Sequence, residues 1–158
     1  MQRILSSLIL CVLLIPSIAS AHCEVPCGIY GDAMRIEMLR EHVTTIEKAM
    51  DQIRALSTEG EPNYNQLVRW VTNKEEHAEQ FQEIVSQYFL HQRIKPAGTD
   101  DTNYVQQLTL LHRMLVGAMK AKQTTDAAHP AQLSELIDAF SESYFTAEEL
   151  EHLREHRG

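Results

Sequence analysis

The sequence has few cysteines, few basic residues and little alternation of apolar with polar side chains. Three cysteines in 158 residues are too few for a disulfide scaffold. The 14 Lys and Arg are outnumbered by 22 Asp and Glu and form no block. This argues against a nucleic-acid partner, because clustered basic side chains bind a phosphate backbone. No segment keeps period two for long, so we expect no sheet but a single globular domain, 44% hydrophobic, that buries a core.

The first 21 residues have the features of a cleaved secretion signal. Arg3 supplies a positive start, residues 4–15 are almost wholly apolar, and Ala19-Ser20-Ala21 is a small-residue cleavage site. Because the apolar run is too short to span a membrane comfortably, an uncleaved anchor is the less favoured reading. Without a twin arginine, we expect export of the unfolded chain, maturation by signal peptidase and a periplasmic or secreted product. Cleavage leaves residues 22–158, with 13 basic and 22 acidic residues and a net charge of −9.

Four segments of the mature chain repeat apolar residues at steps of three and four, which is typical of amphipathic helices. The first segment begins at Asp32, a predicted N-cap, and ends at the breakers within residues 57–63. The other helices are predicted over about residues 65–91, over about 103–122 and from near Pro130. The apolar stripes comprise, in chain order, Ile36, Leu39, Val43, Ile46, Met50 and Ile53; Leu67, Val71, Ala78, Phe81, Val85 and Tyr88; Leu108, Leu111, Leu115 and Ala118; and Leu133, Leu136, Ile137, Phe140 and Tyr144.

Four helices with short links predict an all-α domain, an antiparallel four-helix bundle over about residues 32–146. Lys74 interrupts the apolar stripe of the second helix. After the bundle, Thr146-Ala147-Glu148-Glu149 is a capping-box pattern, which leaves open a short final helix or a charged C-terminal tail.

The new N-terminus carries the chemistry. Residues 22–30, HCEVPCGIY, contain a proline, a glycine and both thiols of the mature protein, so they are expected to be irregular. Cys23 and Cys27 can reach one ion beside the amine and imidazole of His22. Two thiolates with nitrogen donors suit a soft or borderline transition metal, and a planar arrangement would favour nickel or copper over zinc. In an exported protein the same spacing also allows a Cys23–Cys27 disulfide, and spacing alone leaves both readings open.

HCEVPCGIY at residues 22–30 resembles the nickel hook of nickel-containing superoxide dismutases, H-C-x-x-P-C-G-x-Y, which requires this motif at a processed N-terminus. The resemblance continues through residues 35–37, 74–79 and 88–89 and covers most of 22–146. It implies a metal-binding hook on a helical bundle, one nickel ion per subunit and a homohexamer. The implied activity is disproportionation of superoxide to dioxygen and hydrogen peroxide by Ni(II)/Ni(III) cycling.

The resemblance implies a ligand set within the hook. The ligands would be the amine and imidazole of His22, the backbone nitrogen and thiolate of Cys23, and the thiolate of Cys27. Pro26 matches the hook proline, which is expected to follow a cis peptide bond. Glu24 departs from the family pattern, because familiar members have Asp at this position.

Four further residues match positions around the metal. Tyr30 and Tyr88 match two tyrosines near the ion, and Glu37 matches a carboxylate that orients the axial imidazole. His77 falls where an Arg is expected to help hold that imidazole. One residue is missing between Tyr30 and Arg35, which changes the reach of Glu37. Without the motif, Glu37 and His77 would be ordinary surface positions on helices.

Two other classes fit parts of the sequence: an exported nickel- or copper-binding module without turnover, and a structural bundle whose hook is closed by a disulfide. A cytochrome c′-like bundle is excluded because C-x-x-C-H is absent. The net charge of −9 opposes an anionic substrate, so attraction of superoxide must be local. Lys95, in the link after the second helix, is the candidate for that attraction. We expect no stable membrane anchor once the signal is removed.

Overall fold

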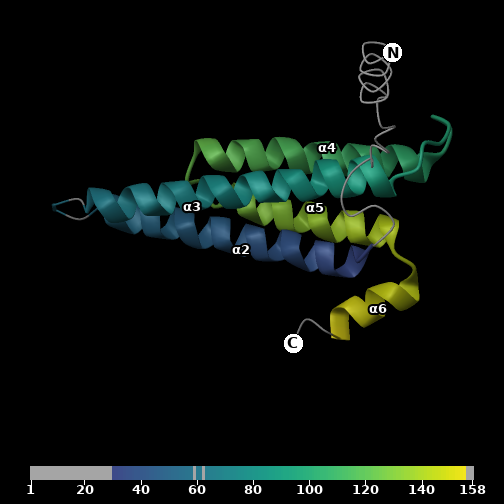
Figure 1. The fold of residues 1–158 in the computed structure, drawn as a ribbon, viewed down its shortest axis with the longest axis horizontal. Coiled ribbons are helices and arrows are strands. Elements are labelled where there is room, and N and C mark those ends of the chain that lie inside the picture. Colours follow the sequence, from purple (N-terminus) through teal and green to yellow (C-terminus); the bar gives the residue numbers. More distant parts are fainter. Residues whose placement is uncertain (1–29, 59, 62, 156–158) are drawn as a thin grey trace, which may run out of the picture. The chain divides into compact units, whose positions relative to one another are not determined.

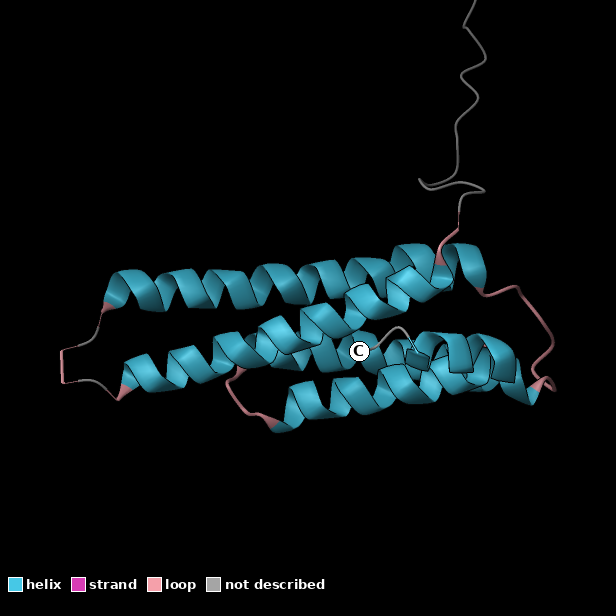
Figure 2. Ribbon diagram, turned by 90° about the horizontal axis from the view of Figure 1, so that it is seen from below, coloured by secondary structure: helices cyan, strands magenta, loops and turns pink. Residues whose placement is uncertain are grey.

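The computed structural model describes residues 30–58, 60–61 and 63–155, and this part of the chain is helical and contains no strand (Figure 1). The residues from Gly31 onward form one compact unit. Four long helical segments run side by side as a bundle, which confirms the predicted all-α architecture (Figures 1 and 2). The elements are α2 (Asp32–Ser57), α3 (Tyr64–Glu83), the π-helix η1 (Ile84–Arg93), α4 (Thr102–Gln123), α5 (Ala128–Tyr144) and α6 (Ala147–Glu155).

The predicted apolar stripes meet in one core, except at the start of the second stripe, where Val71 is exposed and Leu67 is only partly buried and neither belongs to the core. Its largest fully buried side chains include Phe81, Phe89 and Phe140, and they come from η1 as well as from the α-helices. The rings of Phe89 and Phe140 meet edge to face at 5.1 Å, and Tyr144 stacks on Phe140 at 5.3 Å. This aromatic cluster joins η1 to the last turn of α5. None of the helices in the described range is long and apolar enough to cross a membrane.

The helix ends follow capping chemistry, with one correction. The Asp101 carboxylate accepts a hydrogen bond from the Tyr104 amide at 3.0 Å and caps α4. At α6, the Thr146 amide donates to Glu149 at 2.8 Å, so the capping box forms and the C-terminal segment is a short helix. The prediction that Asp32 is an N-cap is wrong: Gly31 holds the cap position, and Asp32 is the first helical residue. Its carboxylate instead accepts hydrogen bonds from side chains that are far away in the sequence.

Lys74 interrupts the apolar stripe because it caps another helix. Its side chain is buried, and its Nζ donates to the carbonyl oxygens of Ala121 at 2.9 Å, Lys122 and Thr124 at 3.3 Å. These carbonyls end α4, where no i+4 amide is left to satisfy them and the helix dipole favours a cation. Lys74 therefore ties α3 to the C-terminus of α4.

The second predicted helix is continuous from α3 into η1, but its last part is a π-helix. The amide of Ile94 donates to the carbonyl of Phe89 at 2.9 Å, five residues earlier. In an α-helix, residues five apart lie about 140° apart around the axis. In a π-helix such residues are neighbours across successive turns. This register puts Tyr88 and Arg93 on the same side of η1, facing the start of α2.

Candidate functional site

The first turn of α2 is held by side chains from two other elements. The carboxylate of Asp32 accepts hydrogen bonds from the Arg93 guanidinium, with Nε–Oδ1 at 2.8 Å and Nη2–Oδ2 at 2.6 Å. The Tyr88 hydroxyl donates to Oδ1 at 2.6 Å, and the Tyr144 hydroxyl donates to Oδ2 at 2.7 Å. Three donors thus converge on one side chain that is 16% exposed. We call Asp32, Tyr88, Arg93 and Tyr144 the Asp32 cluster.

The electrostatics of the Asp32 cluster favour the ionised carboxylate. Burial alone would raise the pKa of Asp32, but the hydrogen bonds from Arg93, Tyr88 and Tyr144 outweigh it and hold the pKa below the ordinary value. Burial and the hydrogen bond to Asp32 raise the pKa of Tyr88 to about 12. The same two causes raise the pKa of Tyr144. At neutral pH, both tyrosines are therefore hydrogen-bond donors to a charged aspartate.

The hydroxyl of Tyr88 also receives a bond from the backbone. The amide of Gly31 donates to Tyr88 Oη at 2.8 Å, so this oxygen accepts from Gly31 while it donates to Asp32. The guanidinium of Arg35 lies over the Tyr88 ring, 5.0 Å from its centroid. Tyr88, which the resemblance predicts to lie near the metal, is thus joined to Gly31, the residue that directly follows Tyr30.

His77 is paired with a second histidine. Its Nδ1 lies 2.9 Å from Nδ1 of His42, on α2, and the two ring centroids are 5.1 Å apart. One ring must donate and the other accept, so at least one of them is neutral in this contact. Burial and the neighbouring His77 lower the pKa of His42. The pair joins α2 to α3 at the position where the resemblance leads us to expect an Arg.

The other predicted residues have their own surroundings. Glu37 lies one turn before Arg40 on α2, with Oε1 3.5 Å from Arg40 Nε, and its side chain is 42% exposed. Tyr30 and Lys95 are exposed. The predicted ligands His22, Cys23 and Cys27 lie outside the described residues, as do Glu24, Pro26 and the signal segment 1–21. Within the described ranges, no three His, Cys, Asp or Glu side chains are grouped to hold a metal.

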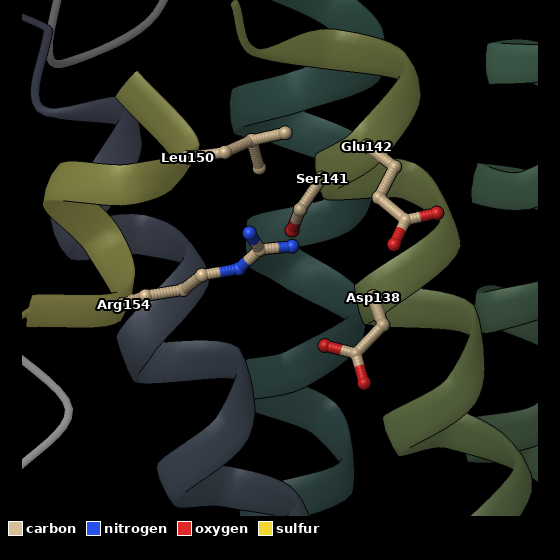
Figure 3. Close-up of a pocket in the computed structure, with 5 residues that line it drawn as sticks. All are labelled: Asp138, Ser141, Glu142, Leu150 and Arg154. Atoms are coloured by element: carbon tan, nitrogen blue, oxygen red, sulfur yellow. The ribbon is translucent and has the colours of Figure 1, made fainter. Parts of the chain in front are cut away.

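Two surface pockets are lined by described residues, and neither lining includes a predicted site residue. One cavity of about 220 Å³ lies between α5 and α6, where Arg154 extends toward Ser141 (Figure 3). Another, of about 210 Å³, lies along α4 and α5. The first is lined by Asp138, Ser141, Glu142, Leu150 and Arg154, and the second by His112, Arg113, Val116, Gly117, Lys120, Gln132 and Leu136.

The sequence did not predict three residues of the Asp32 cluster and the histidine pair: Arg93, Tyr144 and His42. Arg93 and Tyr144 lie 61 and 112 residues from Asp32 along the chain, and no local pattern signals such a contact. Tyr144 was read only as a core position. His42 directly precedes Val43 of the apolar stripe, and this place beside the seam was the one available sign that it is buried.

The helical bundle and the composition of residues 22–30 together indicate an all-α metalloprotein. A family model described as nickel-containing superoxide dismutase matches residues 17–148, which is most of the chain. No curated protein and no solved structure matches it. The chain belongs to the nickel-containing superoxide dismutase family. It is an oxidoreductase that disproportionates superoxide and uses a nickel cofactor.

Proposed function

We propose that residues 22–30 of the mature chain hold the nickel ion through His22, Cys23 and Cys27. The observation that carries this proposal is the sequence HCEVPCGIY, in which both thiols and a histidine occupy the first six positions after the expected cleavage. The donor set fits the metal, because thiolates beside nitrogen ligands suit nickel better than the oxygen-rich sets that magnesium or calcium prefer. Bound nickel would supply one-electron oxidation and reduction of superoxide.

The described residues would position the substrate and the hook. Because the Tyr88 proton is donated to Asp32, Tyr30 and ordered water would deliver the protons that the reaction needs. Arg35 over the Tyr88 ring and the exposed Lys95 supply positive charge on a strongly acidic protein, as local attraction of an anion requires. Pro26 and Glu24 would shape the hook. Glu37 and His77 would act on the orientation of the His22 imidazole, with His42 as the partner of His77.

We also propose how the chain is processed, exported, assembled and loaded with nickel. Signal peptidase would cut between Ala21 and His22, and only this cut creates the amine of His22 as a ligand. The product would be periplasmic or secreted and would assemble as a homohexamer. Nickel would be loaded after export, because the chain crosses the membrane unfolded.

The test is N-terminal sequencing of the mature protein combined with nickel analysis and a superoxide assay. We expect His22 as the first residue and one nickel per subunit. A matched variant carries one extra alanine between Ala21 and His22, with cleavage before the insertion confirmed by mass. It should lose nickel, because the amine is displaced. Full nickel content and full activity in that extended protein would refute the proposed coordination.

A further inference from the structure

The carboxylate of Asp32, at the start of α2, is partly buried and is held by side chains from other helices. Gly31 is the N-cap of α2 and provides no side-chain cap, and Asp32, in the first turn, is favoured by the helix dipole but is less solvated than an acidic residue usually is there. Instead its side chain is 16% exposed and accepts from η1 and α5. Burying a carboxylate is costly unless charge and hydrogen bonds compensate for it. Here the Arg93 guanidinium and two hydroxyls provide that compensation.

The Asp32 cluster determines how the Tyr88 hydroxyl is oriented. Because its proton points to Asp32 Oδ1, a lone pair is directed to the Gly31 amide, which approaches to 2.8 Å. Gly31 and Asp32 are therefore fixed, one through its backbone and the other through its side chain. These are the first two residues after the segment 22–30. The chain entering the proposed hook thus starts from an immobilised anchor.

We propose that Asp32 is a positioning residue of the nickel site, acting with Arg93 and Tyr144 through the hydroxyl of Tyr88. This inference rests on the proposed function. By fixing Gly31 and Asp32, the cluster fixes the point at which the metal-binding segment joins the bundle, and this slows loss of the bound ion. Tyr88 then serves as a link between Asp32 and the backbone, and its proton is not delivered to superoxide.

The experiment compares Asp32→Asn with two controls in the full mature protein. Asp138→Asn is the matched control, because Asp138 also binds an arginine, Arg40, at 2.7 Å, but its side chain is 55% exposed. Ile46→Val lowers stability in the core without touching the cluster. The first readout is the exchange rate of the Gly31 amide by NMR in the nickel-free protein. The second is the rate at which nickel passes to an excess of chelator.

We expect Asp32→Asn to accelerate both rates, with nickel release faster by about 10-fold or more, as for other residues that support metal ligands. Tyr144→Phe keeps the ring and removes one donor, so it should show a smaller effect in the same direction. It also tests the inference if Asp32→Asn does not fold. Both controls should release nickel at the wild-type rate.

Two outcomes separate this inference from the proposed function. If wild type and Asp32→Asn carry one nickel and release it equally fast, the positioning role is refuted and the proposed function stands. The same holds if Ile46→Val releases nickel as fast as Asp32→Asn, because general destabilisation then explains the effect. If the wild-type protein binds no nickel through residues 22–30, the proposed function itself fails.

Discussion

Replacing Lys74 by methionine should destabilise the bundle from the inside. The change keeps a long apolar stem in the core but removes three Nζ hydrogen bonds to the carbonyls of Ala121, Lys122 and Thr124. A hydrogen bond from a charged group contributes about 1.5–3 kcal/mol, and a cation at a helix C-terminus adds up to about 2 kcal/mol. Removal of the buried charge offsets part of this loss. We expect the free energy of unfolding to fall by about 2–4 kcal/mol.

The assay is urea denaturation of nickel-free protein, followed by helical circular dichroism. Lys48→Met is the control, because Lys48 is an exposed lysine on α2, and it should change the free energy by less than about 0.5 kcal/mol. The m-value should stay constant, which shows that the unfolded states are comparable. A loss below about 1 kcal/mol for Lys74→Met would show that the α4 carbonyls do not depend on this lysine, and the capping argument would be wrong.

Five other substitutions test the site and its surroundings. Cys23→Ser and Cys27→Ser should each abolish nickel binding and superoxide turnover while helical circular dichroism stays at the wild-type level; loss of helicity would indicate a structural role instead. Because the pKa of His42 is lowered by burial and by His77, the unfolded chain binds the proton more tightly. The free energy of unfolding of nickel-free protein should therefore fall as the pH decreases below about 6.5, the ordinary histidine value, and His42→Asn should flatten this dependence in urea titrations between pH 5 and 7.5. An unchanged slope would contradict it. Glu37→Ala should lower nickel affinity or activity by about 10–100-fold, whereas His77→Arg should retain both; a chelator titration and a superoxide assay measure these effects, and wild-type values for Glu37→Ala would remove Glu37 from the site.

The helices were predictable because amphipathic periodicity is a local property. The stripes at Ile36–Ile53 and Leu133–Tyr144 matched helices whose bounds lie within a few residues of the prediction. The change from α to π geometry at Ile84 could not be predicted, because both helix types bury a similar apolar face and the spacing of apolar residues does not distinguish them. Tertiary contacts decide such a register.

In the candidate site, too, local motifs could be predicted from the sequence, whereas contacts between helices could not. The hook motif is contiguous, so its ligands could be proposed from sequence, although they lie outside the described residues. Asp32 was misassigned because an aspartate before an apolar stripe suits both an N-cap and a partly buried ion pair. The difference is made by Arg93 and Tyr144, whose approach depends on how η1 and α5 pack. The pairing of His42 with His77 depends likewise on the alignment of two helices.

The contact of Tyr144 with Asp32 has a consequence for the order of folding. It spans 112 residues and closes only when the last turn of α5 has docked, since contacts of long sequence separation require the intervening chain to be ordered first. A chain cut short before Tyr144 lacks one donor to the first turn of α2. Asp32, at the start of α2, therefore has all of its hydrogen-bond donors only when the bundle is complete through the end of α5.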